Sequence, residues 1–307
     1  MRCSAERPVY LSARESVKIA AAACPGAWDR YNGRAVARFP LLLAALLLLP
    51  RSLPAGEKLV LLGGGPRPPE ALARFVEWAG NGRSRLLVVT WASAEPLESY
   101  VSLQRDLHLY RPASIEPAPF APLGPGDKDR LLAAIRRATG IFFGGGDQGR
   151  IMDVLQDREL SEALRERYRN GVVFGGTSAG TAVMSGLTIT GGGDHTVLDG
   201  QKVEVRAGLG LLPGVILDQH FLKRQRQNRL FGLVLDHPRL LGVGVDEGTA
   251  LAVSDNRHAE VVGPGSVMMV DAVAGSDDLV VSLVRPGETF DLKTRRRNRV
   301  TAPAGGG

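Results

Sequence analysis

Short apolar runs alternate with amphipathic segments through the middle of the chain. The apolar runs have the length of buried strands and occupy residues 59–62, 85–90, 140–143 and 172–174. The intervening segments carry apolar side chains at helical spacing and occupy residues 69–78, 99–109, 127–138 and 151–170. Near-continuous apolar strands separated by helices predict a mostly parallel sheet that is covered on both faces. We therefore expect an α/β fold built as a three-layer sandwich.

Glycine-rich segments follow three of the predicted strands, at residues 63–65, 144–146 and 175–180. In parallel sheets, binding and catalytic groups gather at the carboxyl ends of the strands. We therefore expect the functional site to lie at these three segments. Beyond residue 240, shorter apolar runs predict an antiparallel or mixed extension, and they occupy residues 242–245, 250–253, 267–270 and 279–284.

The segment Gly176-Thr-Ser-Ala-Gly180 fits the G-x-S-x-G pattern of a nucleophile elbow. A serine on a sharp strand-to-helix turn needs neighbours without side chains, because the backbone there is strained and closely packed. The turn also directs the backbone amide of Ala179 towards an oxyanion that forms beside Ser178. Ser178 is therefore the candidate nucleophile.

A second glycine pattern, G-x-G-x-x-G over residues 144–149, resembles a dinucleotide-binding loop. Such a site requires an acidic residue at the end of the next strand. That strand instead continues into the serine elbow, so we do not expect a dinucleotide here. The backbone amide of Gly145 or Gly146 is better placed to face the oxyanion from the neighbouring strand end.

The first 55 residues differ from the rest of the chain. An apolar run over residues 40–50 follows Arg34 and Arg38 and precedes a short segment that ends in Ala55, which is the arrangement of a secretory signal. The run is too short to span a bilayer as a helix. We expect a leader and signal peptide over residues 1–55, with the signal itself at about 34–55. We also expect a secreted or periplasmic protein that begins near Gly56 and has no stable membrane association.

Removal of this segment changes the composition. Both cysteines, Cys3 and Cys24, lie within it, so disulfides and cysteine-bound metals are not expected in the mature protein. Eight of the 38 basic and three of the 32 acidic residues also lie there, which leaves 30 against 29. That balance gives no reason to expect a nucleic-acid partner. We expect one catalytic domain over residues 56–290 and a flexible basic and glycine-rich tail over 291–307.

A serine nucleophile needs a base, and the chain has five histidines. His220 ends the apolar run of residues 211–217 in the segment Asp218-Gln-His-Phe, which is a strand-end position. His195 lies in a glycine-rich loop. For the other three histidines, a surface or structural role is the simpler explanation; these are His108, His237 and His258.

The third member of a triad has two candidates, Asp218 and Glu247. Asp218 lies two residues from His220, whereas Glu247 follows another apolar strand and can be brought alongside by the fold. Arg224, Arg226 and Arg229 follow His220. Guanidinium groups bind carboxylates through paired hydrogen bonds, so these arginines can form a carboxylate clamp, although a solvated basic helix is the usual explanation of such a run.

Four motifs follow one another along the chain: Phe142-Phe-Gly-Gly-Gly-Asp-Gln-Gly-Arg150, Gly175-Gly-Thr-Ser-Ala-Gly180, Pro213-Gly-Val-Ile-Leu-Asp-Gln-His-Phe221 with the arginines after it, and Gly244-Val-Asp-Glu247. Together and in this order, they resemble the cyanophycinase and aspartyl-dipeptidase family of serine peptidases. The resemblance extends from Leu59 to about Val253, and the segment with three arginines is closer to the cyanophycinase branch. It implies a flavodoxin-like fold related to class I glutamine amidotransferases.

The resemblance also implies the roles of individual residues. Ser178 is expected to be the nucleophile, His220 the general base and Glu247 the acid that orients it. The residues that match the family's substrate pocket are Gln148, Asp218, Gln219, Arg224, Arg226 and Arg229. The chain departs from the family pattern at Thr181 (usually Ala), Gly144 (commonly Thr) and Pro66 (usually an acid).

The predicted function is that of a secreted serine exopeptidase. It hydrolyses cyanophycin, multi-arginyl-poly-aspartate, to β-Asp-Arg dipeptides and needs no metal or organic cofactor. A homodimer is expected, as is common in the family. The nearest alternative is an aspartyl dipeptidase that acts on short acidic peptides. An α/β-hydrolase esterase is a second alternative, but in that class the acid precedes the histidine in the sequence, whereas here His220 precedes Glu247. A catalytically silent binding protein on an amidotransferase-like fold is the remaining alternative.

Overall fold

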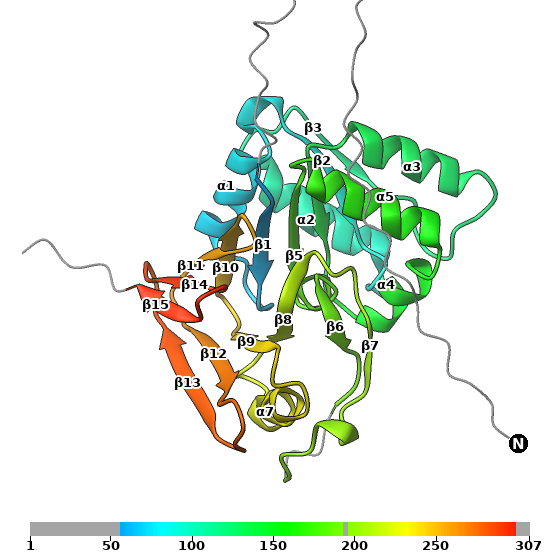
Figure 1. The fold of residues 1–307 in the computed structure, drawn as a ribbon. Helices are drawn as coiled ribbons and strands as arrows, with labels where there is room; N and C mark the ends of the chain where they lie inside the picture. Colours follow the sequence, from blue (N-terminus) through cyan, green and yellow to red (C-terminus); the bar gives the residue numbers. More distant parts are fainter. Residues whose placement is uncertain (1–55, 193–195, 299–307) are drawn as a thin grey trace, which may run out of the picture. The chain divides into compact units, whose positions relative to one another are not determined.

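The computed structural model describes residues 56–192 and 196–298 (Figure 1). The predicted leader and signal peptide, His195 and residues 299–307 lie outside the described residues. Within the described part of the chain, no helix is long and apolar enough to cross a membrane.

A nine-stranded mixed sheet forms the centre of the fold, in the order β15-β14-β11-β10-β1-β5-β4-β2-β3. Its parallel half consists of β1 (Lys58–Leu62), β5 (Val173–Thr177), β4 (Gly140–Phe143), β2 (Arg85–Val89) and β3 (Ser114–Pro117). Its antiparallel half consists of β10 (Ala250–Ser254), β11 (His258–Val262), β14 (Thr289–Asp291) and β15 (Arg296–Asn298).

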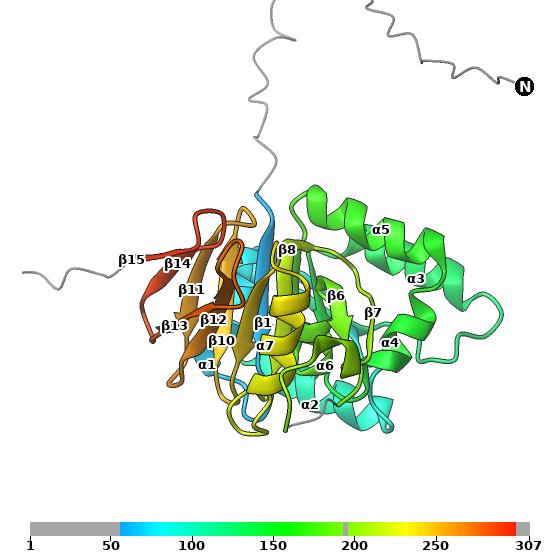
Figure 2. The ribbon, with the colours of Figure 1, turned by 60° about the horizontal axis from the view of Figure 1, so that its bottom comes forward.

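Both faces of the parallel half are covered, because successive side chains of a strand point to opposite faces. Val60 and Leu62 of β1 pack with the apolar sides of α1 (Pro69–Trp78) and α2 (Pro96–His108). Leu59 and Leu61 belong to the core on the other face, under α3 (Asp127–Arg137), α4 (Gln148–Val154) and α5 (Arg158–Arg169). Figure 2 shows the two sets of helices on opposite sides of the sheet. The expected three-layer α/β arrangement is therefore confirmed.

A second, six-stranded sheet packs into the same core, in the order β13-β12-β9-β8-β6-β7. Its strands are β6 (Ser185–Ile189), β7 (Val205–Ala207), β8 (Leu212–Gln219), β9 (Leu241–Val245), β12 (Val267–Ala272) and β13 (Leu279–Val284). The outer face of β8 and β9 is covered by α7 (Gln227–Asp236), whose Leu230 and Val234 pack with Ile216. The remaining helical segments are α6 (Ala179–Ala182), η2 (Asn81–Arg83) and η3 (Gly200–Lys202).

Two sequence-based boundaries differ from the structure. The helix expected over 151–170 is two helices, because the Asp157 carboxylate accepts hydrogen bonds from the amides of Glu159 and Leu160 and so starts α5. The expectation of a flexible tail from residue 291 was wrong for residues 291–298. There, β15 pairs with β14, and the Arg297 guanidinium donates to the Leu283 carbonyl at 2.9 Å.

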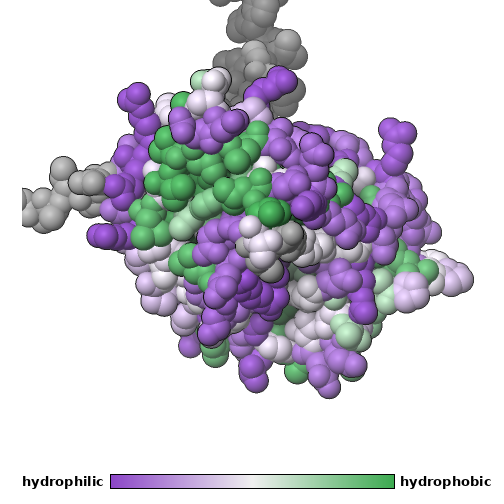
Figure 3. All heavy atoms as spheres, turned by 90° about the horizontal axis from the view of Figure 1, so that it is seen from below, coloured by the Kyte–Doolittle hydropathy of each residue, from purple (hydrophilic) through white to green (hydrophobic). Residues whose placement is uncertain are grey.

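The edge strand β13 exposes apolar side chains. Val280 is 54% exposed, Val281 46% and Leu283 40%. Figure 3 shows an apolar area on the face of the molecule seen from below, surrounded by hydrophilic residues. Isolated apolar residues on a surface are ordinary, whereas a cluster on an edge strand indicates a surface prone to association.

Candidate active site

Ser178 lies where three parallel strands end side by side. β5 pairs with β1 on one side and with β4 on the other, so the segments that follow these strands meet at one edge of the sheet. Residues 63–65 therefore flank Ser178 from one side and residues 144–146 from the other. This is the arrangement expected from the three glycine-rich strand ends.

The backbone at Ser178 has the strain of a nucleophile elbow, with φ 53° and ψ −116°. The glycines around it are required by close packing. A Cβ atom on Gly176 would lie 2.3 Å from the Gly180 carbonyl oxygen, and one on Gly180 would lie 2.2 Å from the Phe143 carbonyl oxygen. The Thr181 hydroxyl donates to the carbonyl oxygens of Leu62, at 2.7 Å, and Gly176, at 2.8 Å, and so ties the elbow to the end of β1.

His220 and Glu247 come from the second sheet. They follow β8 and β9, which are adjacent and parallel, so both side chains emerge at the same edge. Backbone hydrogen bonds join this edge to the loop after β1. The His220 amide donates to the Gly63 carbonyl at 2.8 Å, and the Gly248 amide donates to the Gly64 carbonyl at 3.0 Å. The loop after β1 therefore holds the two sheet edges together at the site.

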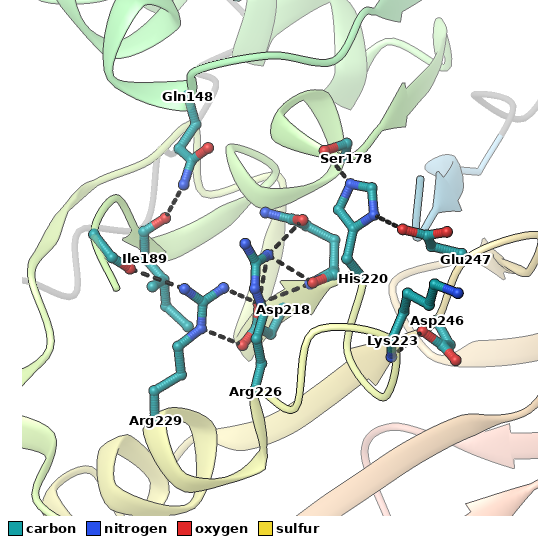
Figure 4. Close-up of polar contacts among 12 residues, drawn as sticks. Gln148, Ser178, Ile189, Asp218, His220, Lys223, Arg226, Arg229, Asp246 and Glu247 are labelled. Atoms are coloured by element: carbon teal, nitrogen blue, oxygen red, sulfur yellow. Dashed lines mark hydrogen bonds and ion pairs between the residues drawn. The ribbon is translucent and has the colours of Figure 1, made fainter. Parts of the chain in front are cut away.

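The three side chains form one line of hydrogen bonds (Figure 4). Ser178 Oγ lies 2.8 Å from His220 Nε2, and His220 Nδ1 lies 2.6 Å from Glu247 Oε1. An ionised carboxylate only accepts hydrogen bonds, so Nδ1 carries the proton in the neutral ring and Nε2 is free to accept one from the serine. This is the geometry of a nucleophile, a base and an orienting acid.

The electrostatics of the pair fit this arrangement. Burial lowers the pKa of His220 below its usual 6.5, and the charges of Arg224 and Arg226 lower it further, while Glu247 raises it. The hydrogen bond from His220 lowers the pKa of the Glu247 carboxyl. At neutral pH the histidine is therefore neutral and the glutamate is ionised, which are the states that proton abstraction from Ser178 requires.

Several backbone amides near Ser178 have no hydrogen-bond partner among the described residues, and those of Ala179, Gly145 and Gly146 are among them. Gly145 lies beside the serine, since a Cβ atom there would be 3.3 Å from Ser178 Cβ. The two predicted oxyanion donors, Ala179 and Gly145, are thus both next to Ser178 and available to donate. Their role stays a prediction.

Five of the six predicted substrate-pocket residues have their polar groups in hydrogen bonds within the protein, as Figure 4 shows, whereas Arg224 is exposed and takes no part in these contacts. Arg229 binds both carboxylate oxygens of Asp218, and both side chains are almost fully buried. Arg226 donates to the carbonyl and the side-chain oxygen of Gln219 at 2.8 and 2.7 Å. Gln148 donates to the Ile189 carbonyl at 2.6 Å. The substrate-binding role of all six residues stays a prediction.

A cavity of about 350 Å³ opens at Ser178. Of the predicted substrate residues only Arg224 lines it, together with His220 and the glycines of the flanking loops. Arg67 and Ser99 also line it, and our sequence analysis did not select them. The signal for Arg67 was its position just after a glycine-rich strand end. A larger cavity of about 650 Å³, under Trp91 and Leu123, contains none of the triad residues.

The other histidines in the described residues lie away from this site. His108, His237 and His258 are exposed, the last on β11. Among the described residues, no cluster of His, Cys, Asp and Glu is arranged to hold a metal ion.

The sequence profile of peptidase family S51 matches residues 59–261. A cyanophycinase from Geminocystis herdmanii is 35% identical over 224 residues, which is 67% of this chain and 76% of that protein. A peptidase E from Shewanella amazonensis is 32% identical over 126 residues, which is 38% of this chain and 52% of that protein.

Among solved structures, a peptidase from an acI-B1 actinobacterium superposes with a TM-score of 0.61. It is 24% identical, and the match covers 78% of this chain and 98% of that one. This likeness concerns the fold.

Proposed function

The chain belongs to peptidase family S51, and from this premise we propose that it is a secreted serine exopeptidase that hydrolyses cyanophycin to β-Asp-Arg dipeptides. The observation that carries the proposal is the line of hydrogen bonds from Ser178 through His220 to Glu247 at a strained elbow. The cyanophycinase name of relatives that match most of the chain supports the substrate.

In the proposed reaction, Ser178 Oγ adds to the carbonyl carbon of the scissile amide as His220 Nε2 takes its proton. Glu247 stabilises the imidazolium that results. The amides of Ala179 and Gly145 donate to the oxyanion. His220 then gives its proton to the leaving amine, and an acyl-enzyme remains on Ser178.

The second half of the reaction uses the same groups. His220 takes a proton from water as the water oxygen attacks the acyl carbon, and the proton returns to Ser178 as the ester bond breaks. The products are a carboxylic acid and the free enzyme. No metal or organic cofactor is needed for any of these steps.

A second candidate is an aspartyl dipeptidase that uses the same triad. Peptidase E relatives favour it, although the one from Shewanella amazonensis matches only 38% of this chain. The two candidates differ in substrate: a dipeptidase cleaves short aspartyl peptides and leaves the polymer intact.

Export is part of the proposal and is supported by the basic, apolar and small-residue pattern of residues 34–55. An exported enzyme would act on polymer released into the surroundings.

Covalent labelling tests the assignment of the nucleophile. A fluorophosphonate probe should label the wild-type protein at one serine, and Ser178→Ala should not be labelled. Soluble cyanophycin should slow labelling by occupying the site. Equal labelling of Ser178→Ala would contradict the assignment. Labelling that cyanophycin leaves unchanged would contradict the substrate but keep the nucleophile.

A further inference from the structure

The cavity at Ser178 has an uneven charge. Among the described residues, the charged side chains that line it are Arg67, which is paired with Asp106, and Arg224; no carboxylate lines it, although the lining His220 is bonded to Glu247. The two arginines come from separate segments, the loop between β1 and α1 and the loop between β8 and α7. Such a cavity favours an anionic group near the scissile bond and disfavours a cationic one.

Arg67 is held in place before any ligand binds. Its Nε donates to Asp106 Oδ2 at 2.8 Å, and its Nη2 donates to Asp106 Oδ2 at 2.5 Å and to Ser102 Oγ at 2.7 Å. Both partners belong to α2. Arg67 also lies between Pro66 and Pro68, which restrict its backbone. Its side chain is 21% exposed. A guanidinium fixed in this way loses little conformational entropy when it binds a ligand.

Part of the donor capacity of Arg67 is unused. Its Nη1 has no hydrogen-bond partner among the described residues, and Arg67 is a lining residue of the cavity. Ser99, one turn before Ser102 on α2, also lines the cavity, and its hydroxyl has no partner among the described residues. A cation and a hydroxyl with free donors on one wall are suited to a carboxylate.

We propose that Arg67, with Ser99, binds a carboxylate of the substrate beside the scissile amide and is a specificity-determining residue of the site. The inference rests on the proposed function, because it requires Ser178 to be the nucleophile. Arg67 would be a substrate-binding residue in addition to the arginines that follow His220. In cyanophycin the carboxylate has two sources, the free C-terminal aspartyl carboxylate of the backbone and the carboxylates of the arginyl side chains.

Synthetic three-unit β-Asp-Arg oligomers test the inference on the full-length purified protein. One form has all carboxylates free, one has the C-terminal carboxylate as an amide, and one has the arginine carboxylates as amides. One of the two amidated forms should have a wild-type KM about ten- to hundredfold higher than the free form, the range of a charge-assisted hydrogen bond. The carboxylate that is blocked in that form is the one that Arg67 binds. Arg67→Ala should raise KM for the free form by a similar factor, keep kcat within about threefold, and no longer respond to that amidation.

Arg74→Ala is the matched control. Arg74 is also a partly exposed arginine bound to an acid, Glu260, at 2.9 Å, but it does not line the cavity. The KM of Arg74→Ala for the free oligomer should equal that of the wild type. An unchanged KM in Arg67→Ala, or wild-type sensitivity to both amidations in that variant, would overturn the inference.

Direct binding separates this inference from the proposed function, since it needs no turnover. Calorimetric titration with N-acetyl-L-aspartate should show binding to the wild type and to Arg74→Ala, and binding at least tenfold weaker to Arg67→Ala. If the wild type cleaves no oligomer but this pattern holds, the cyanophycin proposal fails and the carboxylate site stands. Equal binding to all three proteins, or none to the wild type, would overturn the carboxylate site.

Discussion

At the scale of single residues, the proposed role of His220 as base requires a neutral ring, although the ring lies between a carboxylate and cations. Burial and the charges of Arg224 and Arg226 favour the neutral ring, and Glu247 opposes them. The net effect lowers the pKa of His220, so the ring is neutral at neutral pH, as the proposed mechanism requires. Because the arginines lower the pKa of His220 and Glu247 raises it, a single substitution can shift this pKa in either direction.

The pH dependence of fluorophosphonate labelling measures this pKa without a carboxylate substrate. A protonated His220 cannot accept the serine proton, so the labelling rate should rise with pH through a midpoint below 6.5 and then level off. Arg224→Gln should move the midpoint to higher pH, and Glu247→Gln to lower pH. A wild-type midpoint above 6.5, or shifts in the same direction, would contradict this account.

The buried pair of Asp218 and Arg229 makes a different prediction, on stability. Asp218→Asn leaves the Arg229 guanidinium buried without its counter-charge, which should lower the free energy of unfolding by about 3–5 kcal/mol. Asp153→Asn is the control, because Asp153 is 65% exposed in its pair with Arg206 and such a pair contributes little. Urea unfolding of both variants checks this, and equal losses would show that the buried pair has no special weight.

At the scale of elements, the sequence predicted where the strands lie along the chain, but not how they are divided between two sheets. The elbow, the parallel strands and the strand-end position of His220 were recognisable from the apolar runs, three of which are followed by glycine-rich segments. The division into two sheets was not, because β8 and β9 have the same apolar pattern as the strands of the large sheet. What joins the sheets is a set of backbone hydrogen bonds from the loop after β1, and backbone contacts leave no side-chain pattern. The hydrogen bonds of Arg67 to α2 were hidden for a similar reason, since they span 35 and 39 residues of sequence.

The loop after β1 can be tested through Gly64. A Cβ atom on this residue would lie 2.3 Å from His220 Cε1, and its φ is +103°. Gly64→Ala should therefore displace the imidazole and lower kcat/KM by about a hundredfold or more. Gly126→Ala is the matched control, since Gly126 has a φ of +77° with nothing within 4 Å of the added atom.

Both variants should lose about 1–2 kcal/mol of stability from the left-handed backbone, but only Gly64→Ala should lose activity. Full activity in Gly64→Ala would show that the loop does not position His220.

At the scale of the whole molecule, residues 56–192 and 196–298 contain the core and the candidate site, and the export proposal concerns the N-terminal segment. The homodimer stays a prediction, and light scattering of the purified protein decides it. The exposed apolar side chains of β13 are one surface on which two copies could meet.

Removal of residues 1–55 tests the proposed leader. If this segment is an export signal, a chain that begins at Gly56 should unfold at the same Tm as the full-length chain and keep its kcat/KM. N-terminal sequencing of protein recovered from the medium or periplasm should begin near Gly56. A lower Tm for the shortened chain would show that residues 1–55 are part of the folded protein.

The most direct test of the central claim is mass spectrometry of the soluble products released from insoluble cyanophycin granules. The purified protein should release β-Asp-Arg, and Ser178→Ala should release none under the same conditions. No release by the wild type, together with cleavage of short aspartyl peptides, would contradict the cyanophycinase proposal and favour the dipeptidase. Release of β-Asp-Arg by Ser178→Ala would contradict the catalytic account itself.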